Sequence, residues 1–221
     1  LLMYTVPLPR IGTDIAWRDA AKRLIGAGVT PDQVLWDFDN EMGELFANHT
    51  PLPALTRRIK APQSFVSMAD WVVWHKDPQR FARLYAFLWR LRHEPGLMSD
   101  RADRELAKLR QMEKGVHRCK HKMKAFVRFR DLRQGNARRS FAAWFEPTHH
   151  TVEPTAPFFA RRFADMDWMI ATPDVTAQFV DGNLTFHPGQ PKPDLPEDAA
   201  EALWGTYFCN IFNPARLKIS A

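Results

Sequence analysis

The sequence is poor in cysteine and lacks the short motifs that identify several common enzyme classes. Its 221 residues include only two cysteines, Cys119 and Cys209. It has no Cys-x-x-Cys pair, no Gly-rich phosphate-binding loop and no Gly-x-Ser-x-Gly sequence, so nothing supports a zinc finger, a kinase or a serine hydrolase. It also lacks the run of roughly 20 apolar residues needed to cross a bilayer and a signal-peptide pattern at its start. We therefore expect a cytoplasmic protein with no membrane association, whose cysteines are buried free thiols.

What the sequence does contain is a large apolar and aromatic content. Hydrophobic residues make up 45% of the chain, which includes 16 Phe and 8 Trp. This composition argues against disorder, and the length is sufficient for a substantial core. We expect a single domain over residues 1–221, with two tightly joined subdomains as the alternative.

Positive charge is concentrated in one segment. The formal net charge is +6, but residues 107–139 alone contain twelve Lys/Arg and only two carboxylates, Glu113 and Asp131, a balance of +10. The rest of the chain has nineteen Lys/Arg and twenty-three Asp/Glu, a balance of −4. A localised basic patch is the pattern expected of a surface that binds phosphates.

The hydrophobic periodicity changes from helical in the first half to strand-like in the second. Apolar residues recur at three- and four-residue steps over 13–25, 65–75, 78–91 and 100–123. Alternation then predicts strands over 124–130, 140–146, 168–172, 175–180 and 184–187, and Asp181-Gly182 predicts a hairpin turn. We therefore predict an α+β fold, with a helical N-terminal part (about 1–123) packed on a mostly antiparallel sheet (about 124–187) and a C-terminal helix (about 196–212).

The segment from Lys124 to Arg130 carries the strongest functional signal. As a strand, it would direct Ala125, Val127 and Phe129 into the core and its cations outward, where one aromatic ring accompanies them. The preceding helix adds further cations, some of them four residues apart. Like charges at this spacing destabilise a helix, and an anion bound between them would remove the repulsion. A solvated helix face is the alternative. The predicted nucleic-acid-binding residues are His121, Lys122, Lys124, Phe126, Arg128, Arg130, Arg161, Arg162 and Lys218.

Two further groups of residues have catalytic potential. Lys122 lies among cations that lower an amine pKa and favour a nucleophile, although a lysine that pairs with phosphate is more common. His149 and His150 follow Glu146, an arrangement that suits general acid–base chemistry, although a structural loop is the simpler explanation. With His117 and His121 the two histidines have the composition of a zinc site. Because five Lys/Arg residues lie around His117 and His121 and repel a cation, we expect histidines that face DNA and no metal. We also expect no cofactor.

Four long motifs resemble a bacterial domain family of unknown function. They are HKMKAFVRFR (121–130), WFEPTHHTVEPTAPFFARRF (144–163), WMIATPD (168–174) and NIFNPARLK (210–218). In that family, the domain occurs alone, encoded beside a radical-SAM protein assigned to DNA modification or repair, or fused ahead of a UdgX-type uracil-DNA glycosylase. The opening YTVPLPRIGTDIAWRDAAKRLIGAGV resembles the fused form. The resemblance implies that the chain is the N-terminal module of such a fusion.

These observations support three hypotheses of different classes. The first is a DNA-binding module that acts in repair of uracil-containing or abasic DNA, with a glycosylase or a radical-SAM protein as partner. The second is an abasic-site lyase in which Lys122 forms a Schiff base and His149 or His150 takes a proton. The third is a scaffold that docks a repair protein through helices carrying Arg80, Arg83, Arg90 and Arg92.

Overall fold

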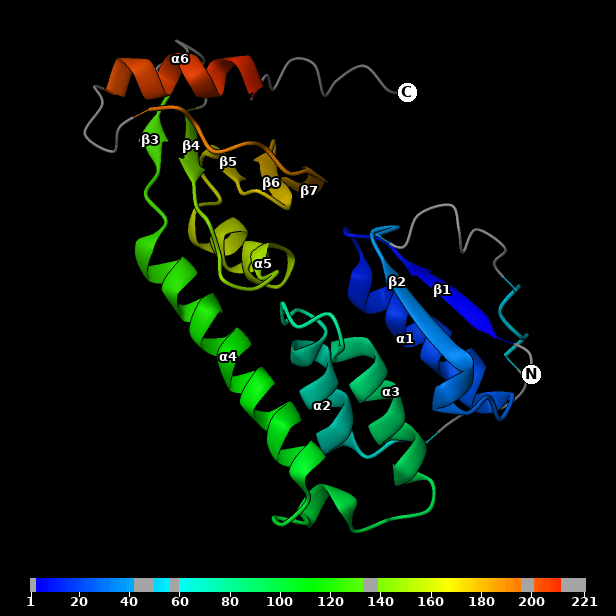
Figure 1. Cartoon of the computed structure of the whole chain (residues 1–221). Helices are drawn as coiled ribbons and strands as arrows, with labels where there is room; N and C mark the ends of the chain where they lie inside the picture. The colour runs from blue at the N-terminus through cyan, green and yellow to red at the C-terminus, as the bar shows by residue number, and fades with distance from the viewer. Residues whose placement is uncertain (1–2, 42–49, 56–59, 133–138, 196–200, 212–221) are drawn as a thin grey trace. The chain divides into compact units, whose positions relative to one another are not determined.

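The computed structural model describes residues 3–41, 50–55, 60–132, 139–195 and 201–211 (Figure 1). The chain divides into two compact units, Leu1–Arg118 and Cys119–Ala221, which are described separately below. Whether they form a single domain stays a prediction. Among the described residues, no helix combines the length and the apolar character that a membrane span requires.

The N-terminal unit contains a small parallel sheet and a set of helices. Strands β1 (Tyr4–Leu8) and β2 (Val34–Phe38) pair in parallel, and α1 (Thr13–Gly26) connects them together with the 3-10 turn η1 (Pro31–Gln33). Helices α2 (Gln63–Val72) and α3 (Arg80–Leu91) follow, and a second 3-10 turn, η3 (Leu97–Ser99), precedes the long α4 (Arg104–Phe126). The helices predicted from periodicity are confirmed. The sequence did not predict β1, in which Pro7 interrupts the strand pattern.

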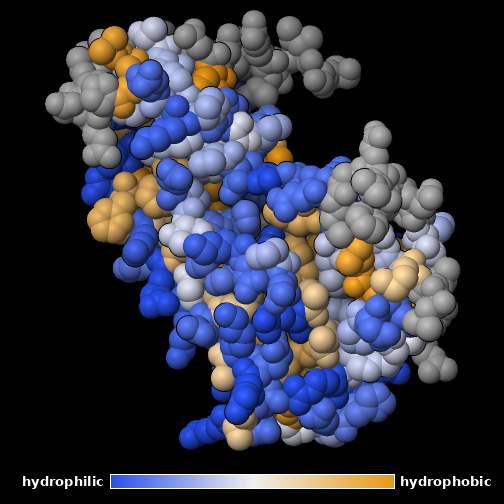
Figure 2. Space-filling view, viewed as in Figure 1, coloured by the Kyte–Doolittle hydropathy of each residue, from blue (hydrophilic) through white to orange (hydrophobic). Residues whose placement is uncertain are grey.

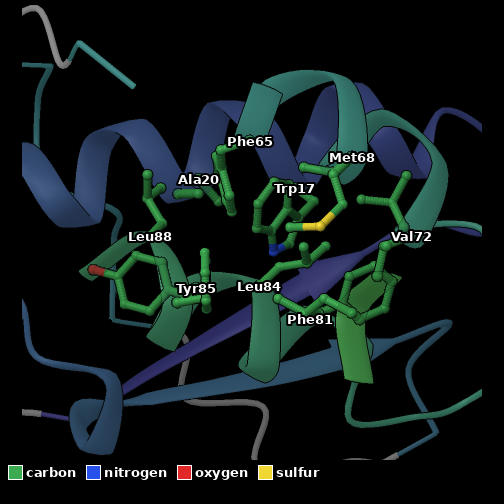
Figure 3. Close-up of a cluster of buried hydrophobic side chains, with 14 of the residues drawn as sticks. Trp17, Ala20, Phe65, Met68, Val72, Phe81, Leu84, Tyr85 and Leu88 are labelled. Carbon is green, nitrogen blue, oxygen red and sulfur yellow. The ribbon is translucent and has the colours of Figure 1, made fainter. Parts of the chain in front are cut away.

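The core of this unit is built from aromatic and aliphatic side chains of α1, α2 and α3 (Figure 3). Trp17 of α1 is followed by Ala20 and Leu24 on the same buried face. The α3 residue Tyr85 is fully buried, and its hydroxyl donates a hydrogen bond to the Val29 carbonyl at 2.7 Å. That bond satisfies the phenol, and burial raises the pKa of Tyr85.

Helix α4 begins at the N-terminal unit and continues into the C-terminal unit. The Asp103 carboxylate accepts the Leu106 N–H at 2.8 Å, so Asp103 provides the N-terminal cap. Asp100, where the helix predicted over 100–123 was expected to begin, instead accepts the Ala102 N–H just before the helix. The predicted apolar stripe is confirmed, because its members are all buried: Leu106, Leu109, Met112, Val116, Cys119 and Met123.

The predicted strand over residues 124–130 is wrong. Helix α4 extends through Phe126, and the Val127 N–H still donates to the Met123 carbonyl at 3.0 Å. Only Arg130–Asp131 forms a strand, β3. Ala125, which alternation directed into the core, is exposed. Val127 continues the four-residue spacing from Met123, and this helical period decided the conformation.

The C-terminal unit is a five-stranded sheet in the order β3-β4-β5-β6-β7. Its remaining strands are β4 (Ser140–Trp144), β5 (Asp167–Ala171), β6 (Val175–Val180) and β7 (Asn183–Pro188). All neighbours pair antiparallel except β4 and β5, which are parallel and joined through α5 (Val152–Arg162). In Figure 1, α5 and α6 (Glu201–Ile211) lie on opposite sides of the sheet. The α+β class and the mostly antiparallel sheet are confirmed.

The turns of this sheet follow the sequence closely. Asp181 and Gly182 have φ of 49° and 81°, as the two-residue turn between β6 and β7 requires, and Val180 pairs with Asn183 across it. The sequence Gly135-Asn136, which favours a turn before β4, lies outside the described residues. Cys119 is buried as expected, whereas Cys209 is half-buried.

Candidate nucleic-acid interface

Cations of the C-terminal unit are presented by the last turns of two helices. On α4, His121 and Lys122 are exposed. The Lys124 ammonium lies 4.2 Å from the centroid of the Phe158 ring on α5, a cation–π contact. Arg161 and Arg162 are exposed in the last turn of α5. In the space-filling view, the outer side of α4 is mostly hydrophilic (Figure 2).

The partners of these cations differ from those of the N-terminal arginines. In the N-terminal unit, Arg83 pairs with Glu105 at 2.9 Å and Arg90 pairs with Asp103 at 2.7 Å. Further pairs join Arg10 to Asp39, Arg18 to Asp70, and Arg23 to Asp19. Within the described part of the chain, by contrast, no carboxylate pairs with Lys122, Lys124, Arg128, Arg161 or Arg162. Their charge is therefore available to an external anion.

The arginines at the end of α4 make contacts within the protein. The Arg128 guanidinium donates to the Ala125 carbonyl at 2.7 Å and so covers the C-terminal end of the helix. Arg130 lies over the Trp204 ring of α6, 4.6 Å from its centroid. Both residues have structural roles, in addition to the phosphate contacts predicted for them.

Phe126 is the last residue of α4, and its side chain is 60% exposed. Phe129, three residues later, is instead packed edge-on against Phe163 at a centroid distance of 5.3 Å and also contacts Phe159 and Trp168. Phe126 therefore lies outside this aromatic cluster. Lys218, the remaining predicted contact, lies outside the described residues.

Lys120 differs from the other lysines of α4. It is half-buried, and burial lowers the pKa of its ammonium, with further contributions from the positive charges of Lys124 and Arg161. Lys122, the lysine chosen from the sequence, is exposed. In the sequence Lys120 was one of several lysines at this helix end, and only its burial in the folded protein distinguishes it.

His150 forms a pair with a carboxylate that the sequence did not identify. Its Nδ1 lies 3.1 Å from Asp174 Oδ2, and both side chains retain partial solvent exposure. Glu146, the predicted partner, is exposed, and among the described residues it has no contact with His150. Asp174 is the last residue of the WMIATPD motif. The sequence therefore marked Asp174 as part of a motif but did not indicate that its carboxylate pairs with His150.

The turn that carries Asp174 is fixed from two sides. The Thr172 hydroxyl donates to the Val175 carbonyl at 2.7 Å and accepts the Val175 N–H at 3.2 Å. Gly189 approaches from the end of β7 so closely that an added Cβ would lie 1.9 Å from the Pro173 carbonyl oxygen. The carboxylate of Asp174 therefore has a defined position relative to the sheet.

The backbone of His149 makes several hydrogen bonds. Its N–H donates to Cys119 Sγ at 3.4 Å, and its carbonyl accepts the Thr151 N–H at 2.7 Å. Because its side chain is buried, His149 is less accessible to a substrate than His150. Of the two histidines predicted as catalytic, His150 therefore has the better position for proton transfer.

The histidine set does not form a metal site in the described part of the chain. The His117 ring contacts Trp71 at a centroid distance of 4.5 Å with the ring planes tilted by 47°, and its Nε2 lies 3.9 Å from Glu113 Oε1. No group of three or more His, Cys, Asp or Glu side chains among the described residues is arranged to hold an ion.

Of the four arginines predicted to form the surface of a docking scaffold, not all lie on the surface. Arg80 is buried, with 2% of its surface exposed, and donates to the Val73 carbonyl at 2.8 Å. Its predicted place on that surface is therefore wrong. Arg92, which lies over the Trp89 ring, is exposed.

The N-terminal unit contains a cavity of about 490 Å³ between α1 and α2. Its floor is apolar and includes Trp17 and Phe65, and its rim carries both signs of charge, among them the Arg18–Asp70 pair. None of the residues predicted to be functional lines it. Because the rim charges are mixed, the cavity does not favour a polyanion.

Comparison with known protein families identifies the C-terminal two thirds of the chain. A family model described as a domain of unknown function (DUF4130) matches residues 78–221. No curated protein and no solved structure matches the chain. The matched range includes the end of α4, all of α5 and the sheet, and hence every residue of the candidate interface.

Proposed function

The chain belongs to the DUF4130 family of domains of unknown function, and we propose that it is a DNA-binding module that acts in repair of uracil-containing or abasic DNA. The observation that carries this proposal is the contrast in charge pairing between the two units. Carboxylates pair with five of the described N-terminal arginines, namely Arg10, Arg18, Arg23, Arg83 and Arg90. Lys122, Arg161 and Arg162 have no such partner among the described residues. Unpaired cations on neighbouring helix ends attract phosphates and release their counterions.

The repair context rests on the resemblance of the four sequence motifs. By that resemblance, the partner is a UdgX-type glycosylase in the same chain or a radical-SAM repair protein. Phosphate contacts give affinity without sequence preference, which suits a module that assists an enzyme with its own lesion specificity.

The proposal is tested by removing the three cations together. Lys122→Ala with Arg161→Ala and Arg162→Ala should weaken binding to a fluorescein-labelled oligonucleotide at least tenfold, or about 1.4 kcal/mol. The matched control is Lys22→Ala with Arg101→Ala and Arg104→Ala, which removes the same charge from exposed positions of the N-terminal unit. Equal losses in both triple variants, or no binding by the wild type, would contradict the proposal.

A second candidate function is cleavage at abasic sites. Two observations favour it: burial lowers the pKa of Lys120, and His150 is paired with Asp174. The Lys120 amine would attack the C1′ aldehyde of the abasic sugar and lose water to give an imine. His150 would then remove a C2′ proton, and the C3′–O bond would break with the phosphate as leaving group.

Borohydride trapping separates this activity from simple binding. Reduction of the imine should covalently link the protein to abasic DNA, and Lys120→Ala should abolish the link. Lys114→Ala, at an exposed position earlier on α4, should preserve it. His150→Ala should preserve the link and slow strand cleavage, because the elimination then lacks its base. Absence of any trapped complex with the wild type would exclude the lyase.

A further inference from the structure

Phe126 occupies an unusual position for a large apolar side chain. It is the last residue of α4 and is 60% exposed, although an aromatic cluster around Phe129 lies in the same unit. Its neighbour Ala125 is exposed, and so is Lys122, which lies one helical turn earlier. An apolar ring bordered by a small side chain and a cation is too small a patch for a protein interface.

The negative partial charge of the backbone at the end of α4, next to Phe126, is offset by an arginine. The C-terminal end of a helix carries partial negative charge, which repels phosphate. Here Arg128 donates to the Ala125 carbonyl at 2.7 Å and to the Val127 carbonyl at 3.4 Å. The guanidinium offsets the repulsion at the point where Phe126 projects.

We propose that Phe126 stacks on the base of an unpaired nucleotide, so that the ligand of this surface is single-stranded DNA. This inference rests on the proposed function and specifies its substrate. The faces of paired bases are covered by their neighbours in a duplex, whereas each base of a single strand has an open face. Lys122, Arg161 and Arg162 would hold the phosphates, and Phe126 would add a contact that a duplex does not offer.

The size of the effect follows from measured base–aromatic stacking. Loss of one stacking contact costs between about 5-fold and 150-fold in affinity. Phosphate contacts are made to either form of DNA, so their loss affects single strands and duplexes together. The two contributions are therefore separable by comparing the two ligands.

The test uses the full chain and fluorescence anisotropy with a labelled 20-nucleotide single strand and its duplex. The wild type should bind the single strand more tightly. Phe126→Ala and Phe126→Leu should weaken single-strand binding by about 5-fold to 150-fold and leave duplex binding unchanged. Phe126→Trp should preserve single-strand binding, because indole also stacks.

Several outcomes would overturn the inference. These are equal wild-type affinity for both ligands, a Phe126→Leu variant that binds like the wild type, and a Phe126→Ala variant that loses both ligands equally. If duplex binding persists and depends on Lys122, Arg161 and Arg162, only the stacking inference fails. If the wild type binds neither ligand, the proposed function fails with it.

Discussion

Arg80 lies at the start of α3 among aromatic side chains, where a charged group is costly unless its donors are used. Its Nε donates to the Val73 carbonyl at 2.8 Å and its Nη1 to the Asp77 carbonyl at 3.1 Å. The guanidinium also lies 4.0 Å from the centroid of Phe81 and 4.5 Å from that of Phe38. It joins the segment between α2 and α3 to the core, which makes it a structural residue of the N-terminal unit.

Replacement of Arg80 should therefore affect stability strongly. We expect Arg80→Ala to lower the free energy of unfolding by about 2–4 kcal/mol, because it removes packing and leaves two carbonyls without their donor. Urea denaturation followed by tryptophan fluorescence measures the change. The control, Arg92→Ala at an exposed position, should cost less than about 0.5 kcal/mol. Similar losses in the two variants would contradict the role of Arg80.

His75 gives the N-terminal unit a dependence on pH. Burial lowers the pKa of His75, Lys108 and Arg80 lower it further, and Asp77 opposes them. Its Nδ1 accepts the Asp77 N–H at 3.0 Å, which requires the neutral ring. Because the folded state binds the proton less readily than the unfolded chain, stability is complete above the unfolded pKa of about 6.5 and declines as pH falls below it.

The contribution of His75 is measured by comparing urea midpoints at pH 7.5 and 5.5. The wild type should be less stable at the lower pH, and His75→Gln should reduce this difference, because its side chain does not titrate. If the urea midpoints of His75→Gln differ between the two pH values as much as those of the wild type, the pH dependence of stability comes from other groups.

At the scale of elements, the end of α4 shows why pattern reasoning failed there. Lys124 to Arg130 alternates in polarity, but Met123 and Val127 also continue a helical stripe that begins at Leu106. Alternation over seven residues was weaker evidence than a period maintained over several turns. The β6–β7 hairpin was predictable because Asp181-Gly182 determines its own turn.

The turn that carries Asp174 depends on the absence of a side chain at residue 189. An added Cβ would lie 1.9 Å from the Pro173 carbonyl oxygen, so Gly189→Ala should displace the turn and destabilise the C-terminal unit by about 1–3 kcal/mol. Gly205 lies within α6 with no heavy atom within 4 Å of an added Cβ. Gly205→Ala should therefore stabilise by up to about 1 kcal/mol. Thermal unfolding compares the variants, and a shift of the same sign in both would contradict this account.

At the scale of the whole chain, the sequence revealed the concentration of positive charge but not the pairing of individual residues. The excess of cations over residues 107–139 is a property of composition. Which arginines are neutralised depends on contacts such as Arg83 with Glu105, 22 residues apart. The pairing of His150 with Asp174, 24 residues apart, likewise required the sheet. The sequence thus predicted the chemistry of the candidate interface, and tertiary structure selected among its residues.

The central claim is that unpaired cations of the C-terminal unit bind the backbone of DNA, and its most direct test is the salt dependence of affinity. If the surface neutralises about six phosphates, the logarithm of the association constant should fall with the logarithm of salt concentration at a slope of roughly −4 for single strands and −5 for duplexes. The slope should become less negative by about 2–3 in Lys122→Ala with Arg161→Ala and Arg162→Ala. An affinity that does not change with salt would contradict the claim.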